Sequence, residues 1–460
     1  MRKNYRCSCA SIDLSYFLLG WVVFVLMLWR LSTMYLATVR LTVILLSLNS
    51  VIMADNWGHW RGPTGNGVAP HGAPPTEWSS TKNVRWKVEL PGRENSSPIV
   101  WENRVFVTTS QVVEPAKDGK LPKLDCILLC LDRKDGSVLW RAVATTAIPH
   151  QGVHETTGFA SASPCTDGEF VYAHFGSRGL YCYTMDGKLV WKRDDFGQME
   201  TLNNFGEGSS PTIEGNKILV PWDHQGPSAL YALDRRTGAT LWKQDRDEPT
   251  GWATPLVVEH EGRKQVIMNG QNFARSYDLE TGEELWRCSG QTVRPIGTPV
   301  ADKGLVFVGS GFQRSYMGAF RLDGKGDIKG TEHVVWEFDK NERMMTDMAS
   351  PLLSSGRIYF HKSKDAMLSC VDAATGKPHY MAERIPGLNG QAYASPVSAG
   401  GHVYLTAVDG TTAVIKDAPE LSVVATNSVG EFVGGTPAPV DNELFIRGEK
   451  HLFCISEEKP

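Results

Sequence analysis

The stretch Ala232–Trp242 (ALDRRTGATLW) places an aspartate, a Thr-Gly turn and a short apolar segment ending in tryptophan within eleven consecutive residues. Two short strands that meet at an Asp-Gly or Thr-Gly turn are typical of an antiparallel hairpin. The same pattern recurs along the chain, with DGSVLW ending at Trp140, DGKLVW at Trp191, TGEELW at Trp286, VVW at Trp336 and TGKPHY at Tyr380. The chain is therefore built from a repeated hairpin unit.

A second repeat is a serine or threonine followed by proline and then by an apolar run. It occurs eight times, at Pro98, Pro164, Pro211, Pro255, Pro299, Pro351, Pro396 and Pro437, with spacings of 41 to 66 residues. Short alternating strands such as Arg104–Val107 and Leu305–Val308 lie between the two repeats. Units of about 45 residues with four short strands are typical of propeller blades. Eight Ser/Thr-Pro repeats predict an all-β, eight-bladed β-propeller of four-stranded blades.

The two ends of the repeat region complement each other. The last unit, Thr436–Ile455, has only three strands, whereas the region opens with an additional strand, Val84–Leu90. Pairing this strand with the last three would complete the eighth blade and leave no open edge in the ring. A set of aromatic residues is expected to be structural, each sealing one blade against the next: Trp86, Trp140, Trp191, Trp242, Trp286, Trp336 and Tyr380.

The first 54 residues form a hydrophobic leader. An uncharged run, Leu14–Trp29, is followed by Arg40 and a second uncharged run, Leu41–Ala54, that ends in a small residue. The second run has the anatomy of a secretory signal peptide, and neither run reaches the ~20 residues of a membrane span. We therefore predict export to the periplasm or cell envelope. The alternative, in which Leu14–Trp29 anchors the protein to the inner membrane, stays open.

Composition and charge restrict the function classes. Hydrophobic residues make up 42% of the chain and charged residues 21%, as in a globular protein. After residue 54 the net charge is about −8, the opposite of the clustered positive charge that nucleic-acid binding requires. We therefore predict no nucleic-acid partner. These patterns divide the chain into a leader (1–54), an opening segment (55–83), the propeller (84–455) and a tail (456–460).

The repeated (A/C)-x-D-x-x-T-G-x-x-x-W pattern resembles the pyrroloquinoline-quinone (PQQ) repeat. That repeat is shared by quinoprotein dehydrogenases and by the outer-membrane assembly propeller of the BAM complex. The sequence NWGHWRGPTGNGV (residues 56–68) resembles the start of exported PQQ-like propellers of planctomycete type. The resemblance covers roughly residues 56–455 and implies the propeller fold. It also implies two function classes, a non-catalytic envelope scaffold and a quinone-dependent oxidoreductase.

The cysteines argue against the quinone enzyme. The resemblance implies that quinoprotein dehydrogenases stack PQQ between a tryptophan and a ring formed by two adjacent disulfide-bonded cysteines, and that they bind Ca²⁺ through Glu, Asn and Asp. This chain has no adjacent cysteine pair. Cys130, Cys182, Cys370 and Cys454 occupy a repeat position that also accepts Ala232, so buried thiols are expected rather than disulfides. We predict no cofactor and no metal, with a periplasmic oxidoreductase that uses PQQ and Ca²⁺ on alcohols or sugars as the alternative.

Polar residues gather in loops on one expected face of the ring. If Ser/Thr-Pro opens the innermost strand of each blade, the crossovers from strand 4 to strand 1 and the loops between strands 2 and 3 share that face. Loops held by a rigid scaffold commonly carry function. The candidate ligand-binding residues in these loops are His154, Glu155, His174, Arg178, Trp222, Asp223, His224 and Arg314. This set favours an anionic or sugar-like ligand at the channel mouth.

Each candidate also has a structural interpretation. His150 and His154 are four residues apart, but their stretch has the composition of a loop, so a zinc pair on a helix face is not expected. Hydrogen bonds to neighbouring turns would equally explain Asp223 and His224. A hydrolase or lyase acting through His154, Glu155, Asp223 and His224 would require the two histidine loops to lie within ~10 Å of each other.

The main prediction is therefore an exported, non-catalytic propeller that binds a protein, peptide or glycan in the cell envelope. No catalytic residue and no oligomeric state are predicted. The Lys-, Pro- and Asp-rich stretch Thr108–Leu124 is predicted to be a mobile surface insertion between two strands of the first blade.

Overall fold

The structure is a computed structural model that describes residues 26–30, 55–312, 314–339 and 348–457. Residues 1–54 and 55–460 form two separate units. Within the leader, residues 26–30 are helical, and the rest of the predicted signal peptide and anchor lies outside the described residues. Over the described ranges, the chain has no helix of the length and hydrophobicity that crossing a membrane requires.

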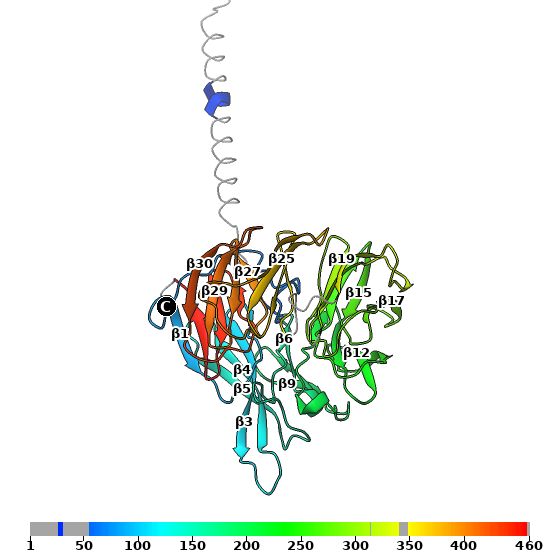
Figure 1. The fold of residues 1–460 in the computed structure, drawn as a ribbon. Coiled ribbons are helices and arrows are strands. Elements are labelled where there is room, and N and C mark those ends of the chain that lie inside the picture. Colours follow the sequence, from blue (N-terminus) through cyan, green and yellow to red (C-terminus); the bar gives the residue numbers. More distant parts are fainter. Residues whose placement is uncertain (1–25, 31–54, 313, 340–347, 458–460) are drawn as a thin grey trace, which may run out of the picture. The chain divides into compact units, whose positions relative to one another are not determined.

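The unit 55–460 contains eight antiparallel sheets, which are the blades of a propeller (Figure 1). Blade 1 consists of β2 (Ile99–Trp101), β3 (Arg104–Glu114), β4 (Lys123–Asp132) and β5 (Val138–Ala147), and blade 2 of β6 (Cys165–Thr166), β7 (Phe170–His174), β8 (Leu180–Thr184) and β9 (Leu189–Arg193). Blade 3 consists of β10 (Thr212–Glu214), β11 (Lys217–Trp222), β12 (Ser228–Asp234) and β13 (Thr240–Arg246), and blade 4 of β14 (Leu256–His260), β15 (Arg263–Met268), β16 (Ala274–Asp278) and β17 (Glu284–Cys288). A short strand, β21 (Gly326–Asp327), pairs in parallel with β17 at the outer edge of blade 4.

Blade 5 consists of β18 (Val300–Asp302), β19 (Leu305–Ser310), β20 (Tyr316–Arg321) and β22 (Val334–Asp339), and blade 6 of β23 (Leu352–Ser354), β24 (Arg357–Lys362), β25 (Met367–Asp372) and β26 (Pro378–Glu383). Blade 7 consists of β27 (Val397–Ala399), β28 (His402–Thr406), β29 (Thr411–Lys416) and β30 (Val423–Ser428), and blade 8 of β31 (Ala438–Val440), β32 (Glu443–Arg447), β33 (His451–Ile455) and β1 (Val84–Glu89). Two 3-10 turns, η1 (Gly176–Arg178) and η2 (Leu202–Asn204), lie in loops.

The ring closes as the sequence predicted. Neighbouring innermost strands contact each other at seven of the eight junctions, including β2 of blade 1 with β31 of blade 8, and a hydrogen bond from the Thr254 N–H to the Thr298 hydroxyl joins blades 4 and 5. β1, from the start of the propeller, pairs antiparallel with β33, from its end, with Trp86 opposite Cys454. The eight-bladed all-β architecture and its closure by the N-terminal strand are therefore confirmed.

At five of the eight junctions, the tryptophan of the outermost strand donates a hydrogen bond to the following blade. The indole Nε1 of Trp191 donates a hydrogen bond of 3.0 Å to the carbonyl of Arg235 in the following blade. Its ring lies against Gly238, whose φ is +73° and where an added Cβ would come within 2.7 Å of the indole. The repeated Thr-Gly turn therefore needs glycine both for its backbone conformation and for the indole. Equivalent bonds join Trp86 to Arg133, Trp140 to Met185, Trp242 to Leu279 and Trp336 to Ala373.

The Ser or Thr before each repeat proline belongs to a closed ring of hydrogen bonds, which we call the hydroxyl belt. The backbone N–H of each belt residue donates to the side-chain oxygen of the belt residue in the next blade, at 2.8–3.2 Å. All belt residues are buried. The belt consists of Ser97, Ser163, Ser210, Thr254, Thr298, Ser350, Ser395 and Thr436. A hydroxyl at this position satisfies a buried amide of the preceding blade, which explains the second sequence repeat.

Blade 1 differs from the others by its length. The predicted mobile insertion, Thr108–Leu124, is instead largely a regular hairpin: β3 continues to Glu114 and β4 begins at Lys123, with Val112 opposite Leu124. The predicted extent of the loop was wrong because the β-branched residues of the TTSQVV segment favour a strand, despite the loop composition that follows them. The hairpin projects from the blade (Figure 1, cyan). We call it the blade 1 arm.

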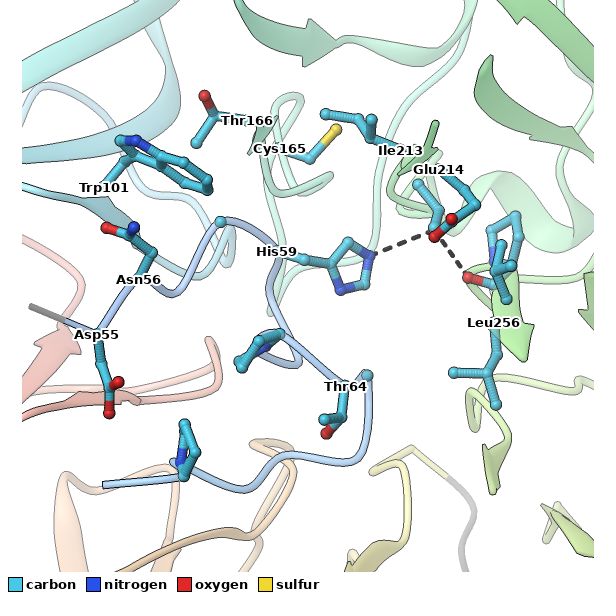
Figure 2. Close-up of a pocket in the computed structure, with 18 residues that line it drawn as sticks. Asp55, Asn56, His59, Thr64, Trp101, Cys165, Thr166, Ile213, Glu214 and Leu256 are labelled. Atoms are coloured by element: carbon cyan, nitrogen blue, oxygen red, sulfur yellow. Dashed lines mark hydrogen bonds between the residues drawn. The ribbon is translucent and has the colours of Figure 1, made fainter. Parts of the chain in front are cut away.

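The opening segment crosses one mouth of the central channel. Residues 55–73, which we call the plug, contact the inner strands of blades on opposite sides of the ring, and Figure 2 shows this backbone running among them. The contacts are a bridge from Trp57 to Val100, the bond from the Thr166 N–H to the Gly58 carbonyl, His59 to Thr212, Asn66 to Ala301 and Val68 to Ser398. The plug therefore closes the channel on the face that carries the turns between strands 1 and 2.

Arg61 holds the centre of the plug. Its side chain is fully buried and donates hydrogen bonds to the carbonyl oxygens of Pro351 at 2.7 Å, Pro396 at 2.9 Å and Asn66 at 3.1 Å. Burial lowers the pKa of Arg61 to about 9, so the guanidinium stays charged at neutral pH. None of its described partners is a carboxylate, so the plug carries a net positive charge at its core.

Candidate functional site

A cavity occupies the end of the channel that the plug leaves open. It has a volume of about 400 Å³ and lies on the face that carries the crossovers between blades and the loops between strands 2 and 3, which we call the crossover face. Seven of the eight belt residues line it, and Trp60 of the plug contributes to its floor. Because the plug lies across the opposite mouth, the cavity is blind.

Aromatic side chains form much of its wall. Phe205, Trp252, Phe312 and Tyr393 line the cavity, and they come from loops of different blades. The indole Nε1 of Trp252 donates to the carbonyl of Gly206 at 2.8 Å, and its backbone N–H donates to Pro295 at 3.0 Å. These bonds tie adjacent crossovers together, so the aromatic wall is held by the backbone of its own loops.

Positively charged side chains outnumber negatively charged ones in the described lining of the cavity. Arg294 and Lys364 line it, and Glu207 is the one carboxylate among the described lining residues. Glu207 is already engaged, because Arg178 lies 3.3 Å from its Oε2 and the Ser177 backbone N–H donates to it at 2.8 Å. The electrostatic balance of the cavity is therefore positive.

Of the eight predicted ligand-binding residues, the structure places His154 in the cavity lining. Its Nδ1 lies 2.8 Å from the Thr156 hydroxyl, and its ring meets Phe205 edge-on at 5.1 Å. Glu155 and Arg314 are exposed and do not line the cavity. Arg178 lies behind the wall, where it pairs with Glu207.

The other four candidates are buried away from the cavity. Asp223 forms a two-point ion pair with Arg246, at 2.8 and 3.0 Å. The Nδ1 of His224 accepts backbone N–H groups from Glu200 and Gly226, each at 3.2 Å, and its Nε2 lies 3.1 Å from the carbonyl of Pro227. Both ring nitrogens are therefore occupied, and the structural interpretation of Asp223 and His224 explains them.

His174 and Trp222 pack together beneath the loops, with ring centroids 6.3 Å apart. His174 is 1% exposed, and burial lowers its pKa to about 4. A neutral, enclosed imidazole contributes to packing at neutral pH, and it is not among the residues that line the cavity. The sequence could not show this, because a loop histidine has the same pattern whether its ring faces a channel or a neighbouring blade.

Sequence reasoning missed Arg294, Lys364, Trp60 and Tyr393. A signal existed for the aromatic residues, since several crossovers carry one large ring: Phe205, Trp252 and Tyr393. For Arg294 and Lys364 the sequence offers only a cation in a loop. What distinguishes them is that no described carboxylate pairs with them, which depends on three-dimensional neighbours.

The residues present do not fit the PQQ and Ca²⁺ site of the quinoprotein dehydrogenases. Across the described ranges, His, Cys, Asp and Glu side chains never gather in a group of three that could hold a metal. The seven described cysteines are buried thiols, and burial raises the pKa of Cys126 to about 11. Cys126 and Cys130 face Ser110 and Phe106 across β3 and β4, so they are not placed to form a ring beneath a quinone.

Comparison with known proteins gives the family. The PQQ_2 family, described as outer membrane protein assembly factor BamB, matches residues 76–193 and 125–332, which together span more than half of the chain. The chain belongs to this family. Among PQQ_2 relatives, the outer membrane protein assembly factor BamB of Alkalilimnicola ehrlichii is 26% identical over 196 residues, which is 42% of this chain and 43% of that protein.

A second relative has an enzyme name. The polyvinylalcohol dehydrogenase of a Pseudomonas species is 23% identical over 272 residues, which is 50% of this chain and 40% of that protein. The chain thus spans less than half the length of both curated relatives. One of the two names is that of an assembly factor and the other is that of a dehydrogenase.

Solved structures of this type share the fold. BamB from Moraxella catarrhalis superimposes with a TM-score of 0.56 at 13% identity, covering 80% of this chain and 98% of that one. A europium-containing methanol dehydrogenase gives a TM-score of 0.61 at 11% identity, covering 86% and 90%. At these identities the likeness shows the PQQ-repeat propeller fold alone.

Proposed function

We propose that this PQQ_2-family propeller is a non-catalytic scaffold of the cell envelope that binds a segment of a partner protein at its crossover face. The observation that carries the proposal is the blind channel, closed by the plug on one side and open to an aromatic-walled cavity of about 400 Å³ on the other. That volume is within the range of specific ligand pockets. The envelope location is supported by the predicted leader and by the names of the BamB relatives.

The blade 1 arm supports a protein partner rather than a glycan. The β3–β4 end of the arm lies where strands 2 and 3 meet, which is the side of the ring that also carries the cavity mouth. Val112 is 55% exposed and Val113 45%, and Ile148, in the crossover that follows β5, is 50% exposed. Burial of exposed aliphatic side chains against another apolar surface is favourable, and the hydroxyl groups of a sugar do not provide such a surface.

The oxidoreductase alternative receives less support from the residues. The cavity lining supplies one carboxylate, Glu207, which is held by Arg178, and the cysteines lie within the blades. The histidine pair of the hydrolase alternative is divided between the cavity, where His154 lies, and the interior, where the backbone occupies His224.

The test is site-specific photo-crosslinking in cells that export the protein. A photoreactive residue is placed at Tyr393 in the cavity lining, at Val112 on the arm, or at Glu261 in the turn between β14 and β15, on the plug side of the ring. We expect Tyr393 and Val112 to yield an adduct with the same envelope protein and Glu261 to yield none. Adducts of equal yield from Glu261, or no adduct from either crossover-face position, would overturn the proposal.

A further inference from the structure

Arg294 is an unusual residue at the cavity wall. It lies in the crossover between β17 and β18, and its guanidinium carbon is 3.8 Å from the ring centroid of Phe312 and 4.9 Å from that of Phe205. It forms no hydrogen bond or ion pair with the described residues, whereas Arg246 and Arg275 each pair with carboxylates. Stacking covers the faces of a guanidinium and leaves the N–H groups along its edge available to an acceptor.

The backbone of Arg294 is also strained. Its φ is +63°, a conformation that costs free energy for any residue with a Cβ. The adjacent crossover fixes the loop in this position, because the N–H of Trp252 donates to the carbonyl of Pro295. Strain of this kind persists where the surrounding structure imposes it, and it is concentrated at binding sites. Here it accompanies an arginine that lies at the wall of a cavity and pairs with no acid among the residues that the structure describes.

A second cation lines the same cavity. Lys364, in the loop between β24 and β25, lines the cavity and has no ion pair within the described part of the chain; the neighbouring Lys362 pairs with Asp365 instead. Below the floor, the Arg61 guanidinium carbon lies 5.6 Å from the Trp60 ring centroid. Charges in a cleft with apolar walls act more strongly than the same charges in open water.

We propose that the cavity selects a partner segment by its acidic side chains, with a carboxylate held at Arg294 and Lys364 and a neighbouring apolar or aromatic side chain packed against Phe205, Phe312 and Trp252. The inference rests on the proposed function, since it specifies which peptide segment the scaffold binds. An inorganic anion would leave the aromatic wall uncovered, and an uncharged apolar ligand would leave two cations without partners. The ligand must therefore carry both a negative charge and an apolar or aromatic group.

A free aromatic carboxylate would satisfy the same chemistry, so the experiment separates the two sources. The probes are a fluorescent peptide of alternating acidic and aromatic residues (Asp-Phe-Glu-Trp, twice), its counterpart with Asn and Gln in place of the acids, benzoate, and PQQ without calcium. Binding to the purified protein is measured by fluorescence anisotropy and by competition. We expect saturable binding of the acidic peptide, at least tenfold weaker binding of the amide peptide, and no competition by millimolar benzoate.

Variants then locate the site. Arg294→Gln is expected to weaken binding of the acidic peptide at least tenfold and Lys364→Gln about threefold, with Arg294→Lys retaining part of the affinity. Arg384→Gln, which removes an exposed arginine that does not line the cavity, should leave affinity unchanged and serves as the matched control. Because Arg294→Gln could also act through folding, its thermal midpoint is measured alongside that of Arg294→Lys, which keeps the charge.

Three results would overturn the inference: equal binding of the acidic and amide peptides, unchanged affinity in Arg294→Gln, or preferential binding of benzoate or PQQ. Equal binding of both peptides together with a crosslink from Tyr393 would leave the scaffold proposal intact and remove only the acidic selectivity. Absence of any crosslink at the crossover face would instead remove the scaffold proposal itself.

Discussion

The backbone N–H of Thr436 donates a 2.9 Å hydrogen bond to the side-chain oxygen of Ser97, a residue 339 positions earlier in the chain. This bond closes the hydroxyl belt at the same junction where β1 completes blade 8. Ring closure thus depends on an inner contact between hydroxyl and amide as well as on an outer strand. Both junctions connect residues from opposite ends of the propeller sequence.

Removing one belt hydroxyl should destabilise the ring. Ser210→Ala deletes the acceptor of the Ser163 N–H, and both residues are buried. An unsatisfied buried amide costs about 1–3 kcal/mol, so we expect a loss of that size in the free energy of unfolding. Ser210→Thr keeps an acceptor and is the control. Urea unfolding measures both variants, and equal midpoints for Ser210→Ala and Ser210→Thr would show that the belt bond contributes nothing.

Glycine at the Thr-Gly turn should be required for the indole as well as for the backbone. Gly238 and Gly262 have φ of +73° and +77°, but a Cβ at Gly238 would come within 2.7 Å of Trp191, whereas one at Gly262 meets nothing within 4 Å. Gly262→Ala therefore reports backbone strain alone, about 1–2 kcal/mol. Gly238→Ala should cost a further ~1–3 kcal/mol through overpacking. Chemical denaturation of the pair gives the difference, and a difference near zero would contradict the indole contact.

Acidification should destabilise the protein partly through His174. Burial lowers its pKa to about 4, below the value of about 6.5 in an unfolded chain. Between these two values the unfolded chain binds a proton that the folded protein does not, so stability falls as pH decreases from about 6.5 to about 4, by up to roughly 3 kcal/mol. His59, with a pKa of about 4, adds to the same loss.

The measurement is the free energy of unfolding at several pH values in that window. His174→Gln should reduce the slope by about one proton compared with the wild-type protein, whatever its effect on absolute stability. An unchanged slope would show that the His174 ring does not titrate as its burial requires.

A chain that begins at Asp55 should gain an ion pair at the start of the plug. The backbone N of Asp55 lies 3.0 Å from Oδ1 of Asp441. In a chain that begins at Asp55 this nitrogen would be an ammonium, and a partly exposed ion pair of this kind contributes about 0.2–1 kcal/mol. We expect such a chain to unfold at higher urea than one with a glycine placed before Asp55. In Asp441→Asn the two forms should unfold alike, and a persistent difference would assign the effect to something else.

The blade architecture could be predicted from the sequence because each repeat reflects the local geometry of a turn or strand. Thr-Gly turns, the tryptophan four residues after the glycine and the Ser/Thr-Pro steps each depend on neighbours in the same or the next blade. The partners of loop side chains were not readable. Asp223 has the pattern of a ligand-binding residue until Arg246, on the outermost strand of the same blade, is seen to occupy both its oxygens.

Arg294 shows the reverse case. Its positive φ and its place between Phe205 and Phe312 depend on residues about 20 to 90 positions away, so no local pattern indicates them. The arm of blade 1 lies between these cases, since its β-branched residues indicated a strand but the Lys- and Pro-rich tip obscured it. Sequence therefore predicts the scaffold better than the identity of unpartnered side chains on its loops.

The position of Arg61 has a kinetic consequence. Its guanidinium bonds to the carbonyl oxygens of Pro351 and Pro396, which lie 290 and 335 residues later in the chain. These acceptors are not in place until blades 6 and 7 have formed, so the plug, which is synthesised before every blade, completes its contacts only late in folding. Closing loops of this length delays the free-energy gain from the contacts they make. The central channel of a newly folding ring is therefore open at both mouths until the plug has docked across one of them.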